Sequence, residues 1–177
     1  MASETPAPGA CYDFRSISEA QTRRFGAALA RVLCPGDVVC LNGRLGAGKT
    51  RLVQAIAAAR GNDSQPVTSP TFTLIHEYVG EVDLFHVDAY RMRDSDEFLE
   101  LGGEEILAAG GICLIEWASR IEDVLPRDVL QVTIAVLGKS ERQISASAAT
   151  KKAAARIEQL RQILDGAGTT SDAGDAE

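Results

Sequence analysis

The sequence predicts an α/β fold of three layers, in which helices cover a sheet of mixed parallel and antiparallel strands. An apolar run over 37–42 passes through a glycine-rich loop into an amphipathic pattern over 49–60, the order strand, loop, helix. Strand-like runs over 71–79 and 82–88 are joined only by a Gly-Glu pair, and so short a connection requires antiparallel pairing. The fully apolar run over 112–115 is typical of a buried parallel strand.

The 177 residues suit one domain, which we place over 12–165. Residues 1–11 are rich in small residues and proline, so we expect a flexible leader there. Ser18 and Gln21 have the spacing of a capping box, and apolar residues follow at helical spacing. The polar tail over 166–177 carries three acidic residues in addition to its small residues and is predicted to be disordered.

The other elements follow from their apolar patterns. The helix over 49–60 has Leu52, Ile56 and Ala59 on one face, and Gly61 ends it. We further predict two short helices in the acidic stretch 94–105, strands over 112–115, 129–136 and 143–147, and a last helix that Thr150 caps and that presents Ile157, Leu160 and Leu164 on its apolar face.

Composition argues against several classes of protein. The net charge is −7, so a large nucleic-acid surface of its own, which would be basic, is not expected. No apolar run reaches the roughly 18 residues of a membrane helix, and residues 1–9 lack a signal-peptide pattern, so we expect a cytoplasmic protein. None of the four cysteines forms a C-x-x-C pair, so no zinc site is predicted, and Cys40 and Cys113 are expected to be buried thiols.

The octapeptide GRLGAGKT at 43–50 fits the P-loop (Walker A) pattern G-x-x-x-x-G-K-T, and its flanking strand and helix are those the pattern requires. It predicts a P-loop NTPase-like fold that binds ATP with Mg²⁺. The glycines let the backbone N–H groups approach phosphate oxygens, with the lysine on the β- and γ-phosphates and the threonine hydroxyl on the metal. The residues expected to hold the nucleotide are Gly43, Gly46, Ala47, Gly48, Lys49 and Thr50.

A P-loop site also needs an acidic residue near the metal, usually at the end of a neighbouring strand. Two residues qualify, Glu116 after the run 112–115 and Asp88 at the end of the run 82–88. Both stay open as metal ligands, although the run before Glu116 better fits a buried central strand. His76 and His86, at alternating strand positions, are interpreted as structural residues rather than ligands.

The segment 68–71, Thr-Ser-Pro-Thr, lies between the P-loop helix and the hairpin. Its hydroxyls could meet the γ-phosphate or the attacking water, and the segment would then behave as a switch. A proline-containing turn that leads into a strand explains the same residues equally well. Trp117 on its own would be a core or interface anchor.

Four segments occur in one order along the chain, and together they resemble the TsaE (YjeE) family of bacterial ATPases for tRNA threonylcarbamoyladenosine (t⁶A) biosynthesis. The resemblance covers about residues 16–147 and is far more specific than the P-loop alone. The segments are Leu45-Gly46-Ala47-Gly48-Lys49-Thr50, Thr68-Ser69-Pro70-Thr71-Phe72-Thr73-Leu74, His86-Val87-Asp88-Ala89-Tyr90-Arg91 and Leu114-Ile115-Glu116-Trp117.

The resemblance implies a Mg²⁺-dependent ATPase that is weak alone and stimulated by its partners. Those partners would be TsaD and TsaB, which modify tRNAs that read codons beginning with A, so contact with tRNA would be indirect. In family terms Thr50 and Glu116 hold Mg²⁺, and Asp88 acts in hydrolysis near the metal's water shell. The catalytic set is then Lys49, Thr71, Asp88 and Glu116, with Thr71 in the switch-like segment. The resemblance also places Trp117 near the nucleotide, makes Glu19 the nucleotide contact from the first helix, and puts Arg51 beside the phosphates.

The chain departs from the family at two positions of the P-loop segment. Many members have Asp at the position of Arg44 and Thr at that of Arg51, so this loop gains positive charge and loses one hydroxyl. Binding of phosphate by the backbone survives both changes, whereas hydrolysis and partner contact are more sensitive to them. The last helix lies outside the clear resemblance. We interpret its basic residues as a solvated face in preference to a contact with a partner or with tRNA; they are Lys151, Lys152, Arg156 and Arg161.

Two other functions compete with the ATPase. A P-loop small-molecule kinase would need an acceptor pocket and a lid that carries arginines, and no clear lid insertion is visible in the sequence. A nucleotide-dependent binding module would hold ATP with negligible hydrolysis. The arginines that a kinase could recruit are Arg91, Arg93, Arg120 and Arg127.

Overall fold

The computed structural model describes residues 9–62 and 64–166. Within these residues, seven strands form one sheet in the order β1-β7-β6-β2-β5-β4-β3. Strands β6, β2, β5 and β4 run parallel at its centre, and antiparallel pairs flank them on both sides. The strands are β1 Ala10–Ser16, β2 Val38–Asn42, β3 Ile75–Tyr78, β4 Leu84–Asp88, β5 Ile112–Glu116, β6 Val129–Val136 and β7 Arg142–Ala148. The predicted mixed α/β fold is confirmed.

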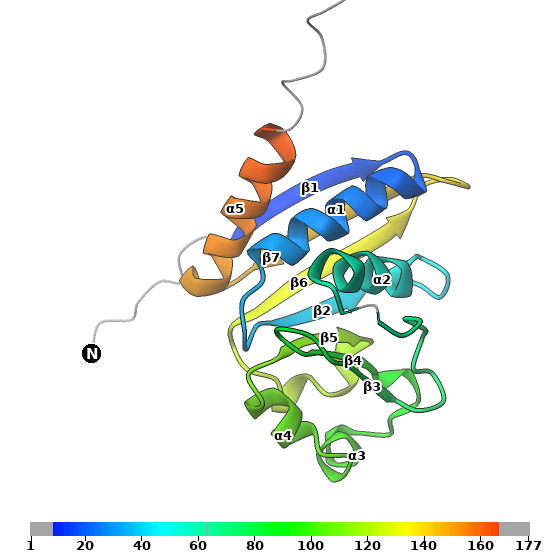
Figure 1. The fold of residues 1–177 in the computed structure, drawn as a ribbon, viewed down its shortest axis with the longest axis vertical. Helices are drawn as coiled ribbons and strands as arrows, with labels where there is room; N and C mark the ends of the chain where they lie inside the picture. Colours follow the sequence, from blue (N-terminus) through cyan, green and yellow to red (C-terminus); the bar gives the residue numbers. More distant parts are fainter. Residues whose placement is uncertain (1–8, 63, 167–177) are drawn as a thin grey trace, which may run out of the picture.

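Helices cover both faces of the sheet and make the three layers. Figure 1 shows α5 toward the β1 end, α1 and α2 along one face, and α3 and α4 at the β3 end. Short 3₁₀ helices follow β4 and β5, the two strands that carry the candidate acids. The helices are α1 Glu19–Val32, α2 Lys49–Arg60, α3 Ser95–Glu100, α4 Gly103–Ala108 and α5 Lys151–Gly166, and the 3₁₀ helices are η1 Ala89–Arg91, η2 Ala118–Arg120 and η3 Glu122–Val124.

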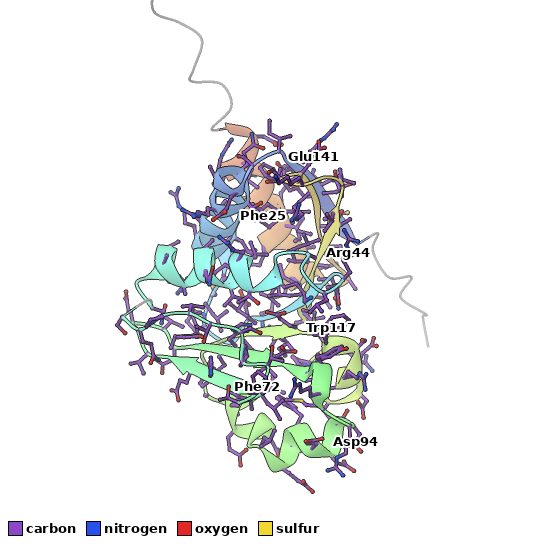
Figure 2. All side chains as sticks on the ribbon, turned by 90° about the vertical axis from the view of Figure 1, so that its right-hand side faces the viewer. Phe25, Arg44, Phe72, Asp94, Trp117 and Glu141 are labelled. Atoms are coloured by element: carbon purple, nitrogen blue, oxygen red, sulfur yellow. The ribbon has the colours of Figure 1, made fainter. Side chains whose placement is uncertain are left out.

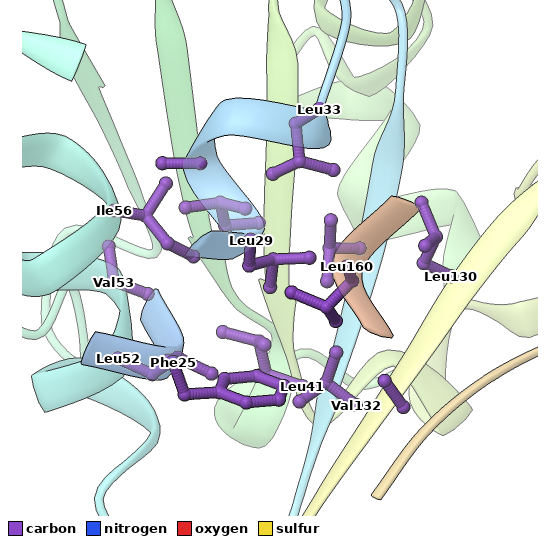
Figure 3. Packing of buried hydrophobic residues seen from close by; sticks show 14 of the residues in the cluster. Phe25, Leu29, Leu33, Leu41, Leu52, Val53, Ile56, Leu130, Val132 and Leu160 are labelled. Carbon is purple, nitrogen blue, oxygen red and sulfur yellow. The ribbon is translucent and has the colours of Figure 1, made fainter. Parts of the chain in front are cut away.

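The larger hydrophobic cluster lies between the sheet and helices α1, α2 and α5 (Figure 3). Phe25 and Leu29 of α1 and Leu160 of α5 are fully buried in it, against the strand residues Leu41 and Val132. Side chains alternate along a strand, so every second residue of the central strands joins this cluster. Burial of this apolar face, rather than helix propensity, accounts for most of the stability of these helices.

The alternate residues of the same strands face a second cluster under α3 and the 3₁₀ helices. Phe85 and Val87 of β4 pack there, with Phe98 of α3. Their neighbours Leu84, His86 and Asp88 must then point toward α2. This alternation places the polar end of β4 on the face that carries the P-loop helix.

The predicted helices are confirmed, with one error of detail. Helix α1 begins after Ser18, whose side chain accepts the N–H of Gln21, while the Gln21 side chain accepts the N–H of Ile17. Helix α2 has the predicted bounds and ends at Gly61, in the left-handed conformation. Ala59, however, is exposed, because the buried face of α2 continues through Val53 and Ala57 instead.

The strand predicted over 71–79 is wrong in its first half. Residues 71–74 form a turn, in which the N–H of Leu74 bonds the carbonyl of Pro70. Leu74 has φ of 66°, a left-handed conformation that an apolar residue rarely adopts. Its carbonyl accepts the N–H of Asp88, so the turn is fastened to the end of β4 and the strand begins only at Ile75.

Strand β1 was not predicted, and it shortens the expected leader. Ala10 and Cys11 already pair with Ala148 and Ser147 of β7. The remaining leader residues 1–8 and the tail residues 167–177 lie outside the described residues, while Gly166 closes α5. The basic residues of α5 are partly used within the fold, since Arg156 pairs with the buried Asp37 at 2.9 Å and Arg161 donates to the carbonyl of Cys11.

Candidate nucleotide-binding site

The loop between β2 and α2 is shaped by three glycines with positive φ, namely 146° at Gly43, 76° at Gly46 and 111° at Gly48. A Cβ at Gly43 would lie 2.7 Å from the carbonyl oxygen of Ile134, so only glycine fits there. Cβ atoms at Gly46 and Gly48 would meet no atom within 4 Å, so these residues face open space. Backbone with this geometry can approach an anion closely, as phosphate binding requires.

Helix α2 begins beneath this loop without a side-chain cap on its first N–H groups and without an acidic residue in its first turn. Its N-terminus can therefore receive an anion. Lys49 is buried, and its Nζ donates to the carbonyls of Gly43 at 2.9 Å and Arg44 at 3.3 Å. The ammonium also lies 4.5 Å from the centre of the Trp117 ring. The loop thus holds its lysine in place with its own carbonyls.

Glu116 collects three polar groups around one carboxylate at the end of β5. Its Oε1 accepts the Thr50 hydroxyl at 2.9 Å and lies 3.0 Å from Nε2 of His86. Its Oε2 lies 3.8 Å from Nζ of Lys49. Glu116 is only 4% exposed, so these contacts replace most of its hydration.

Asp88 is the register partner of Glu116 in the parallel pair β4–β5, so the two carboxylates end neighbouring strands on one face. Oδ2 of Asp88 accepts the Thr71 hydroxyl at 3.0 Å and lies 3.5 Å from that of Ser69, while its Oδ1 accepts the N–H of Tyr90 at 3.0 Å. The hydroxyls of Ser69 and Thr71 are 2.7 Å apart. Asp88 therefore connects Ser69 and the turn 71–74 to the sheet.

The rest of that segment is held by a separate network on β3. The hydroxyl of Tyr78 donates to the carbonyl of Thr68 at 3.2 Å and accepts its N–H at 3.3 Å. His76 lies between Tyr78 and Thr73, with ring nitrogens 3.1 Å and 2.7 Å from their hydroxyls. Both ends of 68–73 are thus fastened, while Phe72 at its tip is 84% exposed and lies under the guanidinium of Arg91.

Trp117 has φ of 59°, an uncommon conformation for a non-glycine residue and one found at functional sites. The Trp117 ring lies next to both Lys49 and Tyr90, and the ring centres of Trp117 and Tyr90 are 5.0 Å apart. Figure 2 shows Trp117 on the same side of the molecule as Arg44 of the loop. The structure brings Trp117 to the P-loop, as expected of a residue near the nucleotide.

These groups surround a cavity of about 470 Å³, a volume in the range of small-ligand sites. A second hollow of about 290 Å³ lies on the other side of the loop, and Gly46, Gly48 and Arg51 line both. The first is lined by Leu45, Gly46, Gly48, Lys49, Thr50, Arg51, Ser69, Thr71, Asp88, Tyr90, Arg91, Glu116 and Trp117. The second is lined by Glu19, Thr22, Gly46, Ala47, Gly48, Arg51, Lys139, Ser140 and Arg142.

Glu19 lies at the rim of the second hollow, where Arg23 and Arg51 both approach its Oε1 to 2.5 Å. The hydrogen bond from Arg23 and the charge of Arg51 lower the pKa of this exposed carboxyl. The guanidinium of Arg51 therefore pairs with Glu19 of helix α1, although Arg51 also lines the main cavity. Arg44 lines a third, basic hollow together with Lys139 and Arg142.

The side chains in the main cavity suit a hard divalent cation. Thr50, Asp88 and Glu116 offer hydroxyl and carboxylate oxygens, the ligands that Mg²⁺ takes together with phosphate oxygens and water. Among the described residues no cysteine lines this cavity, and burial raises the pKa of the Cys40 and Cys113 thiols to about 12, which disfavours the thiolate form that binds metals. The residues present therefore fit a magnesium–nucleotide complex.

The predicted residues of the two loops meet as expected, but sequence reasoning missed part of the site. The structure gathers Lys49, Thr50, Thr71, Asp88, Glu116 and Trp117 around one cavity, with Glu19 and Ala47 on the adjoining hollow. Gly43 shapes the loop, and its carbonyl accepts a hydrogen bond from the Lys49 ammonium. His86 was interpreted as structural, yet it touches Glu116; its position two residues before Asp88, on the same strand face, was the available signal. Tyr90, which was given no role from the sequence, also lines the cavity, as does Ser69 of the predicted segment 68–71.

Comparison with known proteins agrees with this geometry. The family model "Threonylcarbamoyl adenosine biosynthesis protein TsaE" matches residues 16–144, most of the chain. The chain belongs to the TsaE family. A TsaE of Bacillus subtilis is 41% identical over 136 residues, which cover 76% of this chain and 84% of the relative. A TsaE of Treponema pallidum is 38% identical over 130 residues, which cover 73% and 96%.

The fold of the TsaE family is shared as well. A crystal structure of Bacillus subtilis YdiB superimposes with a TM-score of 0.74 at 34% identity, covering 88% of this chain and 97% of that one. The two relatives above carry the name tRNA threonylcarbamoyladenosine biosynthesis protein. Among the residues described here, no helix is both long and apolar enough to cross a membrane.

Proposed function

We propose that this chain binds ATP with Mg²⁺ and hydrolyses it as a cytoplasmic component of the bacterial t⁶A tRNA modification machinery, in which it acts with TsaD and TsaB. One observation carries the proposal. The P-loop lysine and threonine, Lys49 and Thr50, share a single cavity with the strand-end acids Asp88 and Glu116. Membership of the TsaE family supplies the pathway, since the relatives are named for threonylcarbamoyladenosine biosynthesis in tRNA.

In this proposal the nucleotide lies across the loop, with its phosphates at the N-terminus of α2. The γ-phosphate end points toward the carboxylates, and the nucleoside occupies the second hollow beside Glu19 and Thr22. Support comes from Gly46 and Gly48, which line both hollows, so that one extended ligand can pass from one to the other. Lys139 and Ser140 also line this second hollow.

Each side chain then has a defined task. Lys49 neutralises charge on the β- and γ-phosphates, and Thr50 and Glu116 hold the metal or its waters. Mg²⁺, when bound, offsets the negative charge that develops on the phosphate oxygens. Asp88 accepts a proton from, or orients, the attacking water, and Thr71 fixes the carboxylate of Asp88 through the 3.0 Å hydrogen bond.

The partners supply what the isolated site lacks in this account. Arg91 is the one arginine of the four considered for a lid that borders the main cavity, and its guanidinium rests on Phe72. Arg93 pairs with Glu97, Arg120 reaches the carbonyl of Met92, and Arg127 borders a different hollow. A small-molecule kinase, which closes arginines over the phosphates, is therefore the weaker alternative.

Phosphate release from ATP tests the proposal. The protein is assayed alone, with a panel of hydroxyl and carboxyl acceptors, and with purified TsaB–TsaD, each with Mg²⁺ and with EDTA. We expect slow Mg²⁺-dependent release alone and faster release with TsaB–TsaD. Phosphate transfer to an acceptor would make the chain a kinase, and tight binding without turnover in any mixture would make it a binding module.

A further inference from the structure

His86 is a polar residue between two apolar neighbours in the middle of the buried strand β4. Its side chain is 0% exposed, between Phe85 and Val87, which face the other cluster. Burying an imidazole costs free energy unless its nitrogens are hydrogen-bonded. Nε2 lies 3.0 Å from Oε1 of Glu116, whereas Nδ1 has no partner among the described residues. Space filling alone does not account for a buried ring that leaves one nitrogen unsatisfied.

The contact with Glu116 assigns the proton on the ring. An ionised carboxylate only accepts hydrogen bonds, so Nε2 of His86 has to carry the hydrogen. Oε1 of Glu116 then accepts two bonds, one from His86 on β4 and one from Thr50 on α2. Two donors from different elements hold one oxygen, which fixes the orientation of the whole carboxylate. Oε2 lies 3.8 Å from the ammonium of Lys49, a residue that lines the cavity.

We propose that His86 is a positioning residue for the magnesium site, because it fixes Glu116 so that Oε2 meets the metal or its water shell. The inference rests on the proposed function, since it concerns the Mg²⁺ of a bound nucleotide. His86 acts through Glu116 and touches neither nucleotide nor metal. Hydrogen-bonded partners of this kind change metal affinity or activity by about 10- to 100-fold when they are removed.

A matched pair of variants separates positioning from packing. In His86→Gln the side-chain amide can place an N–H near the position of Nε2, whereas the shorter His86→Asn reaches only the position of Nδ1. Both remove the ring, and a packing role predicts losses of affinity that are as large in EDTA as with Mg²⁺. The positioning role predicts that Gln restores what Asn loses.

The readout is the affinity for a non-hydrolysable ATP analogue, measured by calorimetry with Mg²⁺ and with EDTA. We expect His86→Asn to lower the Mg²⁺-dependent gain in affinity by about tenfold or more, His86→Gln by less than about threefold, and neither to change the affinity in EDTA. In a Glu116→Gln background, His86→Asn should add no further loss, because its effect passes through Glu116. Equal losses in Asn and Gln variants, or additive losses in the double variant, overturn the proposal.

Two further results keep the outcomes separate. If the wild-type protein gains no affinity from Mg²⁺, the proposed function fails; if it does gain and His86→Asn matches it, only this inference fails. Should His86→Asn not fold, the imidazole ¹⁵N spectrum of the wild type decides. A proton on Nε2 whose resonance moves in Glu116→Gln is expected, and a proton on Nδ1 overturns the inference.

Discussion

The two sides of the main cavity are built in different ways. The P-loop side presents backbone groups, shaped by Gly43, Gly46 and Gly48, with the Lys49 ammonium fastened to loop carbonyls. The opposite side presents two strand-end carboxylates that are held by side-chain hydrogen bonds, Asp88 by Thr71 and Glu116 by Thr50 and His86. Backbone geometry tolerates changes in most side chains, whereas a hydrogen bond between two side chains is lost when either partner is replaced.

This difference explains why two departures from the family pattern leave the loop intact. Arg44 lines a basic hollow with Lys139 and Arg142, and Arg51 pairs with Glu19, while the carbonyls of Gly43 and Arg44 still hold the Lys49 ammonium. It also predicts a division of labour. Changes on the P-loop side should act on nucleotide affinity, and changes on the side-chain side should act on the metal and on turnover.

Lys49→Ala should have the largest effect on affinity. The ammonium makes charge-assisted contacts to the phosphates, and hydrogen bonds to charged groups contribute about 1.5–3 kcal/mol each, so loss of two should weaken ATP binding by at least about 100-fold. Calorimetry measures this directly. Arg44→Ala is the matched control on the same loop, and it should change affinity by less than about fivefold. Unchanged affinity in Lys49→Ala would remove the basis of the P-loop assignment.

Asp88→Asn should have the largest effect on turnover. A side chain that accepts or orients the proton of the attacking water contributes about 10²- to 10⁴-fold, so phosphate release should fall by about 100-fold or more while the nucleotide stays bound. Asp96→Asn, the same change at an exposed position of α3, should leave turnover unchanged. Normal phosphate release in Asp88→Asn would reduce Asp88 to a structural tie for Ser69 and the turn 71–74.

Glu116→Gln should act on the metal rather than on the phosphates. The amide keeps the shape of Glu116 but loses the charge that faces the cavity, so the Mg²⁺-dependent gain in nucleotide affinity should fall by about tenfold. Affinity in EDTA should stay the same. Glu100→Gln, on the exposed end of α3, provides the control. Equal and small changes in both variants would exclude Glu116 from the metal site.

Thr71→Ala should have a smaller effect of the same kind as Asp88→Asn. It removes one hydrogen bond to Asp88, and a bond of this kind contributes about 1 kcal/mol, so phosphate release should fall by roughly fivefold. Thr71→Ser keeps the hydroxyl and should restore most of the rate. If serine and alanine reduce turnover equally, the methyl group rather than the hydroxyl of Thr71 matters.

The sequence predicts the backbone side of the site far better than the side-chain side. Glycine spacing and the flanking strand and helix locate the P-loop, because these features are local. The contact between His86 and Glu116 joins residues from two strands, and it depends on β4 lying beside β5, which no local pattern states. The position of Asp88 beside Glu116, as register partners at the ends of β4 and β5, follows from the same adjacency of the two strands.

The same distinction holds for the fold. Helix α2 is predicted to its ends because a loop and a glycine mark them. Edge strand β1 is missed although exposure alternates along its sequence Ala-Cys-Tyr-Asp-Phe-Arg-Ser, because it follows directly on the proline-rich start of the chain. The run 71–74 has the composition of a strand but forms a turn. Its bonds to Asp88 come from Thr71 and Leu74, so tertiary contacts override β-propensity there.

The segment 68–73 links the side-chain side of the cavity to the outside of the molecule. Thr71 bonds Asp88 within the site, while Phe72 beside it is almost fully exposed. A partner that docks on this segment could therefore change the position of Asp88, and occupancy of the cavity could change the segment. Such coupling is reciprocal, so if ATP tightens the complex with TsaB–TsaD, the complex must tighten ATP binding by the same factor.

Phosphate release by the purified protein, with Mg²⁺ and saturating ATP, in the presence and absence of TsaB–TsaD, tests the central claim most directly. Complex formation is measured in parallel with ATP, with ADP and without nucleotide. The account predicts slow release alone, faster release with the partners, and association that depends on the nucleotide. Release that the partners do not change, together with association that is the same in all three nucleotide states, would contradict it.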